Sequence, residues 1–194
     1  MINDQAQKLR DVVSKNKETK TDKAPKIVCI SSGKGGVGKS NFTTNTALEL
    51  IKRGKKVIII DADLGLANVE ILLGVVSKKN FSDLINSGAN IKDIITVTNN
   101  GIGLISGGSG ILELADLSND KLEIVLESIS QLNEMADYIL IDTGAGISNV
   151  FTAFAKLAHE VVVITTCEPT SVADAYALIK SLVIKDREKD ISVV

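Results

Sequence analysis

The pattern of apolar and polar positions along this chain changes repeatedly between two periods. Short runs of consecutive aliphatic residues alternate with longer segments in which apolar residues recur every three or four positions. The runs predict strands at residues 26–32, 56–61, 138–142 and 161–165, and a last strand that begins at Ile191. The longer segments predict helices at residues 40–53, 120–135, 147–157 and 171–185. This alternation is typical of an α/β fold, in which helices flank a mostly parallel sheet on both faces.

Residues 96–106 interrupt the alternation, because two short apolar stretches flank the turn sequence Asn99-Asn100-Gly101. That pattern predicts a hairpin, or a turn that leads into another strand. Before the first predicted strand the chain is rich in polar residues, and residues 14–25 show no apolar periodicity. The expected organisation is a short N-terminal segment with a flexible linker, residues 1–25, followed by one domain over residues 26–194.

Composition narrows the class of protein. The chain has 194 residues, of which 44% are hydrophobic but only 3% aromatic, so a domain with an aliphatic core is expected. A net charge of −2 and a pI near 5.5 give no general electrostatic reason to expect a nucleic-acid partner. The two cysteines, Cys29 and Cys167, form no paired motif for a zinc site, an iron–sulfur site or a disulfide framework. No signal-peptide pattern and no apolar run of about 18 residues is present, so a cytoplasmic location is expected.

The strongest chemical signal is a glycine-rich loop between the first predicted strand and the first predicted helix. Its sequence, GKGGVGKS, fits the pattern GxxxxGK[ST], in which backbone N–H groups and a helix N-terminus surround nucleotide phosphates. In this pattern Lys39 is expected between the β- and γ-phosphates, and the Ser40 hydroxyl on Mg²⁺. The predicted nucleotide-binding residues of this loop are Gly33, Lys34, Gly35, Gly36, Val37, Gly38, Lys39, Ser40 and Asn41. The alternative is a glycine-rich turn without a ligand.

Acidic residues follow two of the predicted strands, at the edge where an open parallel sheet binds ligands. Asp61 and Asp63 follow the second strand and precede Asn68 in a glycine-containing loop. Asp142 ends the third strand and is followed by Gly144, as in a Walker B strand. We expect Asp142 to hold Mg²⁺ through water, and Gly144 to let the next loop approach the γ-phosphate. The alternatives are an Asx turn for Asp63 and a helix cap for Asp142.

Lys34 is a second lysine inside the loop, where an ordinary phosphate loop does not need one. With this lysine the loop resembles that of the deviant Walker A ATPases, the family of MinD and ParA. The resemblance implies that Lys34 acts in trans, on the nucleotide of a dimer partner, and that Lys39 acts in cis. It also implies that Asp61 lies near Mg²⁺, that Asp63 positions or activates the attacking water, and that Asn68 reaches the phosphates or that water. The predicted catalytic residues are thus Lys34, Lys39 and Asp63, and the predicted metal ligands are Ser40, Asp61 and Asp142. A solvated surface lysine is the alternative for Lys34.

Further strings narrow the resemblance to the FlhG family, also called YlxH or FleN. They are DADLGLANVEILLG, SGGSGILELADLS, DTGAGIS and CEPTSVADAYALIK, and the resemblance extends over residues 26–194. It implies a P-loop NTPase fold and a Mg²⁺-dependent ATPase that converts ATP to ADP and phosphate. It further implies an ATP-dependent homodimer that regulates the number and placement of bacterial flagella, with flagellar C-ring proteins among its partners.

The N-terminal sequence Asp4-Gln5-Ala6-Gln7-Lys8-Leu9-Arg10 matches the DQAxxLR segment of the FlhG family. In that family the segment is a helix that binds FlhF, an SRP-type GTPase, and stimulates its GTP hydrolysis. The resemblance therefore implies partner contacts by Asp4, Gln5, Ala6, Leu9 and Arg10. The alternative is a disordered, solubilising basic tail.

The last predicted strand, which begins at Ile191, looks incomplete, so we expect the C-terminal part of the domain to be missing. In the FlhG family that part includes residues that recognise the base, and an amphipathic segment that attaches reversibly to the inner face of the cell membrane. Membrane association is therefore expected only for the full-length form. Two alternatives to flagellar regulation stay open: MinD-type placement of the division site, and a nucleotide-binding scaffold without catalysis. ParA-like partitioning is less favoured, because the composition offers no basic DNA-binding surface.

Overall fold

The computed structural model describes residues 24–63, 68–108 and 119–194, and within them seven strands form one sheet. The strands are β1 (Lys26–Ser31), β2 (Val57–Ala62), β3 (Thr96–Val97), β4 (Gly103–Ile105), β5 (Tyr138–Thr143), β6 (Glu160–Val163) and β7 (Asp190–Val193). Their order across the sheet is β3-β4-β2-β5-β1-β6-β7, and each neighbouring pair is parallel except β3 with β4. The prediction of a mostly parallel sheet is confirmed.

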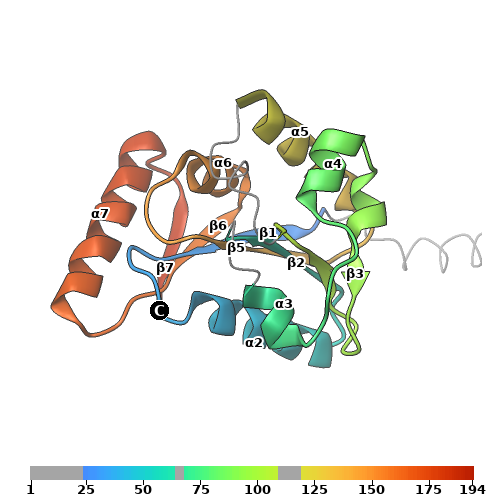
Figure 1. The fold of residues 1–194 in the computed structure, drawn as a ribbon. Coiled ribbons are helices and arrows are strands. Elements are labelled where there is room, and N and C mark those ends of the chain that lie inside the picture. The colour runs from blue at the N-terminus through green and yellow to red at the C-terminus, as the bar shows by residue number, and fades with distance from the viewer. Residues whose placement is uncertain (1–23, 64–67, 109–118) are drawn as a thin grey trace, which may run out of the picture.

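Helices flank this sheet on both faces (Figure 1). They are α2 (Lys39–Lys52), α3 (Asn68–Leu73), α4 (Phe81–Ser87), α5 (Asn119–Ile129), α6 (Asn149–Leu157) and α7 (Pro169–Lys185), with two 3₁₀ helices, η1 (Ile91–Ile94) and η3 (Ser130–Leu132). In Figure 1, α2 and α3 lie below the sheet, and α4, α5 and α6 lie above it. No helix within the described ranges is long and apolar enough to cross a bilayer. The predicted α/β class is confirmed.

The central strands are apolar along their whole length because they send alternate side chains into two separate cores. In β1, Ile27 and Cys29 belong to the core that α4, α5, α6 and α7 share, whereas Ile30 belongs to the core that α2 and α3 share. In β2, Ile58 and Ile59 divide between the two cores in the same way. Burial on both faces explains why these strands are continuous aliphatic runs in the sequence.

The interruption at residues 96–106 is a hairpin that also adds a parallel strand. β3 and β4 pair antiparallel around a turn in which the Thr98 N–H donates to the Ile102 carbonyl over 2.9 Å. The Gly101 N–H donates to the Thr98 carbonyl over 2.9 Å, closing the turn. β4 then runs parallel to β2. The hairpin and the additional strand, which the sequence offered as alternatives, are therefore both present.

The structure differs from the predicted elements in three main respects. The helix predicted over residues 120–135 ends at Ile129 and continues only as the 3₁₀ helix η3. α6 begins at Asn149 and not at residue 147, because the Ser148 side chain accepts a hydrogen bond from the Phe151 N–H over 3.0 Å and caps the helix. Between β2 and β3 the structure adds α3, α4 and η1, which are four to seven residues long and too short to show a clear period.

Candidate nucleotide-binding site

A cavity lies at the carboxyl end of the central strands, where the loop after β1 meets the segment after β2. Its volume of about 440 Å³ is within the range of small-molecule sites. Eight of the predicted residues line it, namely Gly35, Gly36, Gly38, Lys39, Ser40, Asn41, Asp63 and Asn68. Ile71, Leu72 and Ala145 also line the cavity, and the sequence did not single them out. Ile71 and Leu72 belong to α3, the short helix that periodicity missed.

The glycine loop presents its backbone and a helix N-terminus to this cavity. Gly36 and Gly38 have φ angles of 77° and 99°, so a side chain at either position would strain the backbone. Gly38 directly precedes α2, and no side chain caps that helix. The first N–H groups of α2 therefore have no capping oxygen, and this arrangement suits an anion. Lys39, the first residue of α2, is only 6% exposed.

Two residues of the loop hold it in place without lining the cavity. A Cβ at Gly33 would overlap the backbone carbonyl of Asp174, so this glycine is required by the close approach of α7. Val37 packs against the core that α2 and α3 share. The Ser32 hydroxyl also donates to the Lys34 carbonyl over 2.7 Å. The loop is thus attached to α7 on one side and to the core on the other.

Two buried carboxylates stand side by side at the ends of β2 and β5. Asp61 and Asp142 are partners in the register of these parallel strands, and they are 1% and 0% exposed. Asp61 accepts hydrogen bonds from the Asp63 N–H over 3.2 Å and from the Val69 N–H over 3.3 Å. Burial, and next the charge of Asp142, nevertheless raise the pKa of Asp61 to about 7. The protein alone therefore does not balance the negative charge of this pair.

Asp142 has one carboxylate oxygen without a partner. Its Oδ1 accepts a hydrogen bond from the Thr43 hydroxyl over 3.3 Å, whereas Oδ2 is buried and accepts none. Burial raises the pKa of Asp142, although the Ser40 hydroxyl and the Lys39 charge oppose that shift. A buried oxygen in this state fits Mg²⁺ or a water molecule bound to it. Over the described residues, no three His, Cys, Asp or Glu side chains are grouped to hold a metal, so phosphate and water oxygens would have to complete the coordination.

Asp63 lines the cavity and lies against Gly144 in the loop after β5. A Cβ at Gly144 would come within 3.2 Å of Asp63 Oδ1, so a larger residue there would press on that carboxylate. Gly144 does not line the cavity, although its neighbour Ala145 does. The expected approach of Gly144 to a γ-phosphate stays a prediction, and the structure adds a spacing role beside Asp63.

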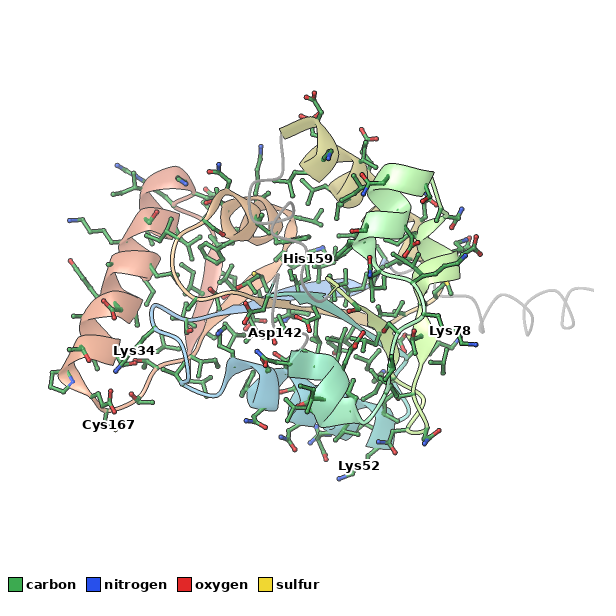
Figure 2. All side chains as sticks on the ribbon, viewed as in Figure 1. Lys34, Lys52, Lys78, Asp142, His159 and Cys167 are labelled. Carbon is green, nitrogen blue, oxygen red and sulfur yellow. The ribbon has the colours of Figure 1, made fainter. Side chains whose placement is uncertain are left out.

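Lys34 does not line the cavity, and its side chain reaches the start of α7. Its Nζ lies 2.7 Å from Oε2 of Glu168, and the two side chains are 43% and 63% exposed. Figure 2 shows Lys34 toward the α7 side of the molecule, apart from Asp142 at the sheet. The two lysines of the loop therefore have different environments, with Lys39 buried at the cavity and Lys34 on the surface.

Comparison with known proteins decides the family. The ParA family model, described as NUBPL iron-transfer P-loop NTPase, matches residues 23–190. The chain belongs to the ParA family. Among its relatives, the antiactivator FleN of Pseudomonas aeruginosa is 37% identical over 156 residues, which are 80% of this chain and 56% of FleN. The flagellum site-determining protein YlxH of Helicobacter pylori is 39% identical over an alignment of 193 positions, and the match covers 97% of this chain and 64% of YlxH.

The solved structures agree with this ParA-family assignment. The septum site-determining protein MinD of Pyrococcus horikoshii, solved as a complex with Mg-ADP, is 28% identical and has a TM-score of 0.74. The match covers 86% of this chain and 68% of that one. The P-loop NTPase fold and the resemblance to the FlhG family, which includes FleN and YlxH, are confirmed. The chain spans 56% and 64% of the lengths of FleN and YlxH, respectively.

The two cysteines of this ParA-family chain do not form an iron site of the kind that the family description names. Cys29 is buried in β1, and burial raises the pKa of its thiol to about 12. A thiol that ionises so poorly is a weak metal ligand. Cys167 is exposed before α7, and the sequence contains no further cysteine. The chemistry of the site therefore rests on the glycine loop, lysines and carboxylates.

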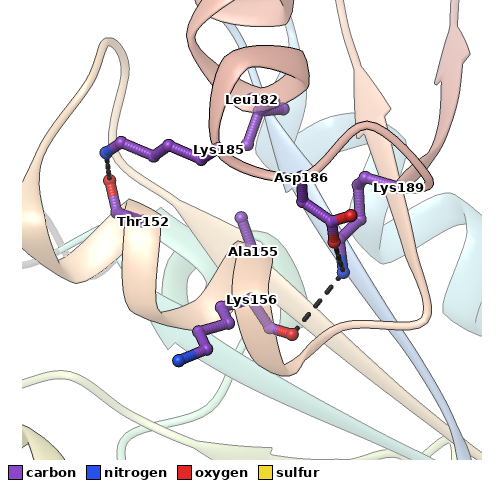
Figure 3. Close-up of a pocket in the computed structure, with 7 residues that line it drawn as sticks. All are labelled: Thr152, Ala155, Lys156, Leu182, Lys185, Asp186 and Lys189. Atoms are coloured by element: carbon purple, nitrogen blue, oxygen red, sulfur yellow. Dashed lines mark hydrogen bonds and ion pairs between the residues drawn. The ribbon is translucent and has the colours of Figure 1, made fainter.

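A second, smaller cavity of about 260 Å³ lies between the C-terminal ends of α6 and α7 (Figure 3). The Lys185 ammonium donates to the Thr152 hydroxyl over 3.2 Å, and that of Lys189 donates to the Ala158 carbonyl over 2.8 Å. This cavity has no glycine loop, and two of its lysines already have partners within the protein. The larger cavity is accordingly the candidate nucleotide site. Residues 4–10, the predicted contact with FlhF, lie outside the described residues.

Proposed function

We propose that this chain is an ATP-dependent dimerisation switch of the FlhG type, which regulates the number or placement of bacterial flagella. The observation that carries the proposal is the environment of two oppositely charged groups. Lys39 lines the cavity, whereas Asp142 does not line it but lies beside Ser40, which does. Lys39 is buried, and Asp142, which the Ser40 hydroxyl and Thr43 approach, keeps an oxygen without a partner. A phosphate chain with bound Mg²⁺ supplies a complementary charge to each of these groups.

The proposed roles follow from where each side chain lies. Lys39 would lie between the β- and γ-phosphates, which the N–H groups of the glycine loop surround. Ser40 would ligate Mg²⁺ directly, and Asp61 and Asp142 would hold it through water. The bound ion would neutralise charge on the phosphates. Asp63, whose carboxylate borders the cavity, would position the attacking water and accept its proton.

Lys34 would make hydrolysis depend on a second copy of the chain. Because its side chain lies outside its own cavity, it is available to neutralise charge on a partner's transferring phosphoryl group. Two ATP-bound copies would then pack face to face, and hydrolysis would return them to monomers. Ile71 and Leu72, which line the mouth of the cavity, are 76% and 44% exposed. An apolar rim of this kind suits a surface that a second copy covers.

The flagellar assignment rests on relatives. FleN and YlxH are 37% and 39% identical to this chain, compared with 30–33% for its MinD relatives. The YlxH match covers 97% of this chain, so it extends into the segment before residue 24. We place the FlhF contact in that segment, and flagellar C-ring proteins are further proposed partners. The proposed location is the cytoplasm, with reversible membrane association of the full-length form. MinD-type placement of the division site is the alternative.

The decisive experiment follows molar mass by light scattering, and ATP hydrolysis, as Mg²⁺-ATP is added. Wild type should form dimers with ATP but not with ADP. Asp63→Ala should still pair but hydrolyse about a hundredfold more slowly, as expected on loss of a general base. Lys34→Ala should lose hydrolysis. Lys52→Ala, which removes an exposed lysine from the far end of α2, is the matched control and should behave as wild type.

Two other outcomes of this experiment would change the assignment. If wild type binds ATP but neither forms dimers nor hydrolyses the ATP, the switch proposal is wrong and the scaffold alternative is supported. If Lys34→Ala hydrolyses ATP normally, the proposed action in trans is wrong.

The N-terminal assignment needs a separate test. Deleting residues 1–25 should leave ATP hydrolysis intact and abolish stimulation of the FlhF GTPase. The matched control scrambles residues 4–10 at constant composition, and it should lose the stimulation in the same way. Full stimulation by the scrambled chain would show that the segment acts only as a basic tail.

A further inference from the structure

The hydroxyl of Thr43 lies between α2 and the buried carboxylate at the end of β5. Its Oγ1 is 3.0 Å from the Lys39 carbonyl oxygen, one turn earlier in α2, and 3.3 Å from Asp142 Oδ1. Thr43 and Asp142 are both 0% exposed, so these contacts are shielded from water. Thr43 follows Ser40 by three residues, a spacing that places both on one face of α2, and the Ser40 hydroxyl also approaches Asp142. α2 therefore presents two hydroxyl groups to this carboxylate.

The Thr43 hydroxyl has one hydrogen and two acceptors within reach, a backbone carbonyl and a carboxylate. A hydrogen bond to an ionised carboxylate is stronger than one to a neutral carbonyl, so Asp142 is the favoured acceptor when it is charged. The next residue, Thr44, shows the ordinary arrangement of a helical threonine. Its hydroxyl donates to the Ser40 carbonyl over 2.7 Å and also lies 3.1 Å from the following carbonyl of α2. Thr43 differs from Thr44 by its contact with a carboxylate of the site.

We propose that Thr43 is a positioning residue of the ATPase site, whose hydroxyl holds Oδ1 of Asp142 so that Oδ2 stays available to water bound to Mg²⁺. The inference rests on the proposed role of Asp142 at the metal. Thr43 does not line the cavity, so it acts only through Asp142. Oδ2 is buried and accepts no hydrogen bond within the described part of the chain. Fixing the other oxygen orients the carboxylate before the ion arrives, which reduces the entropy lost on binding.

The test measures the affinity for ADP by isothermal titration calorimetry, once with Mg²⁺ and once with EDTA. The ratio of the two affinities reports what the metal contributes, and it requires neither dimerisation nor hydrolysis. Thr43→Val keeps the branched shape but removes the hydroxyl, and we expect it to lower the ratio about three- to tenfold. This is less than the roughly 10- to 100-fold typical of groups that orient a direct metal ligand, because Asp142 acts through water. Affinity without Mg²⁺ should not change, and Thr43→Ser, which restores the hydroxyl, should restore the ratio.

The matched control is Thr44→Val, which removes a neighbouring buried hydroxyl whose contacts are with backbone carbonyls of α2. Its ratio should equal that of wild type. If Thr43→Val keeps the ratio of wild type, or loses affinity equally with and without Mg²⁺, the hydroxyl is merely structural and the inference is overturned while the nucleotide site stands. A lowered ratio in Thr43→Ser would also overturn it. If wild type binds ADP equally well with and without Mg²⁺, the proposed role of Asp142 is wrong and the inference fails with it.

Discussion

Charged and polar groups at the two edges of the central sheet differ in whether they have partners within the protein. At the amino edge, Lys26 pairs with Glu160 over 2.6 Å, and His159 Nδ1 accepts a hydrogen bond from the Ile27 N–H over 3.0 Å. At the carboxyl edge, Asp61 and Asp142 are buried side by side, and Asp142 Oδ2 has no partner. The same strands therefore end in satisfied groups on one side and unsatisfied groups on the other.

This difference indicates that the amino edge stabilises the fold and that the carboxyl edge is suited to bind a ligand. A buried carboxylate without a partner lowers the free energy of unfolding, so a sequence selected for stability alone would replace it. Such a group persists where a ligand supplies the missing interaction. We therefore expect substitutions at the carboxyl edge to change ligand binding and to be neutral or stabilising without ligand. Substitutions at the amino edge should reduce stability and leave binding intact.

The largest predicted effect is the dependence of stability on pH at the carboxyl edge. The pKa of Asp61 is about 7 in the folded protein, against an ordinary value of 3.8. The folded state therefore holds this proton more tightly, and its contribution to stability is complete below pH 3.8 and lost as pH rises through 7. The contribution is at most about 4 kcal/mol. Urea unfolding between pH 4 and pH 8, without Mg²⁺ or nucleotide, should show it.

Asp61→Asn supplies the comparison for that experiment. Asparagine has the same shape and does not titrate, so the fall in stability between pH 4 and pH 8 should be much smaller than in wild type. At pH 8 the variant should be the more stable protein. Equal slopes for the two proteins would show that Asp61 is ordinarily charged and that the carboxyl edge is not strained.

The next effect concerns the buried lysine of the glycine loop. Lys39→Ala should weaken binding of Mg-ADP about 10- to 100-fold, since a hydrogen bond to a charged group contributes roughly 1.5–3 kcal/mol. Isothermal titration calorimetry measures this loss. Lys39 is only 6% exposed, and burial of a cation costs free energy, so its removal should not lower the melting temperature in the absence of nucleotide. A large drop in melting temperature would mean that Lys39 supports the fold and not the ligand.

The parts of the fold and site that the sequence predicted are those encoded within a few residues. The glycine loop needs only its own eight positions, and the buried strands needed only their continuous aliphatic character. α4 had a local signal as well. Asn80 and Asp83 form a capping box, in which the Asn80 N–H donates to Asp83 over 2.9 Å and the Ser82 N–H donates to Asn80 over 2.8 Å. A search for caps would have found this helix where periodicity did not.

The remaining features depend on contacts between distant segments. Asp61 and Asp142 are neighbours only because β5 lies beside β2 in the sheet. The sequence of neither strand predicts which strand lies next to it. The contacts of Gly33 with Asp174 and of Lys34 with Glu168 likewise require α7 to dock beside the loop. The motif predicted a glycine at position 33 and a lysine at position 34, but it did not predict what either touches.

A smaller effect is expected at the amino edge from His159→Ala. The imidazole Nδ1 accepts the Ile27 N–H, and Ile27 is 8% exposed, so the variant leaves a buried donor without its acceptor. The expected loss of stability is about 1–3 kcal/mol, measured by urea unfolding at pH 8. Affinity for Mg-ADP should not change. A change in affinity would show that the amino edge also affects ligand binding, contrary to the roles inferred for the two edges.

The smallest effect is expected from Glu160→Gln, which removes the ion pair with Lys26. An exposed ion pair contributes little, so the free energy of unfolding should fall by less than about 1 kcal/mol, and the loss should shrink as salt is added. Glu160 also accepts a hydrogen bond from the Ser192 hydroxyl over 2.8 Å, which glutamine can retain. This contact ties β6 to β7 at the amino edge of the sheet. If Glu160→Gln cost several kcal/mol, the ion pair would be a main support of the contact between β1 and β6, and the amino edge would be as sensitive to charge as the carboxyl edge.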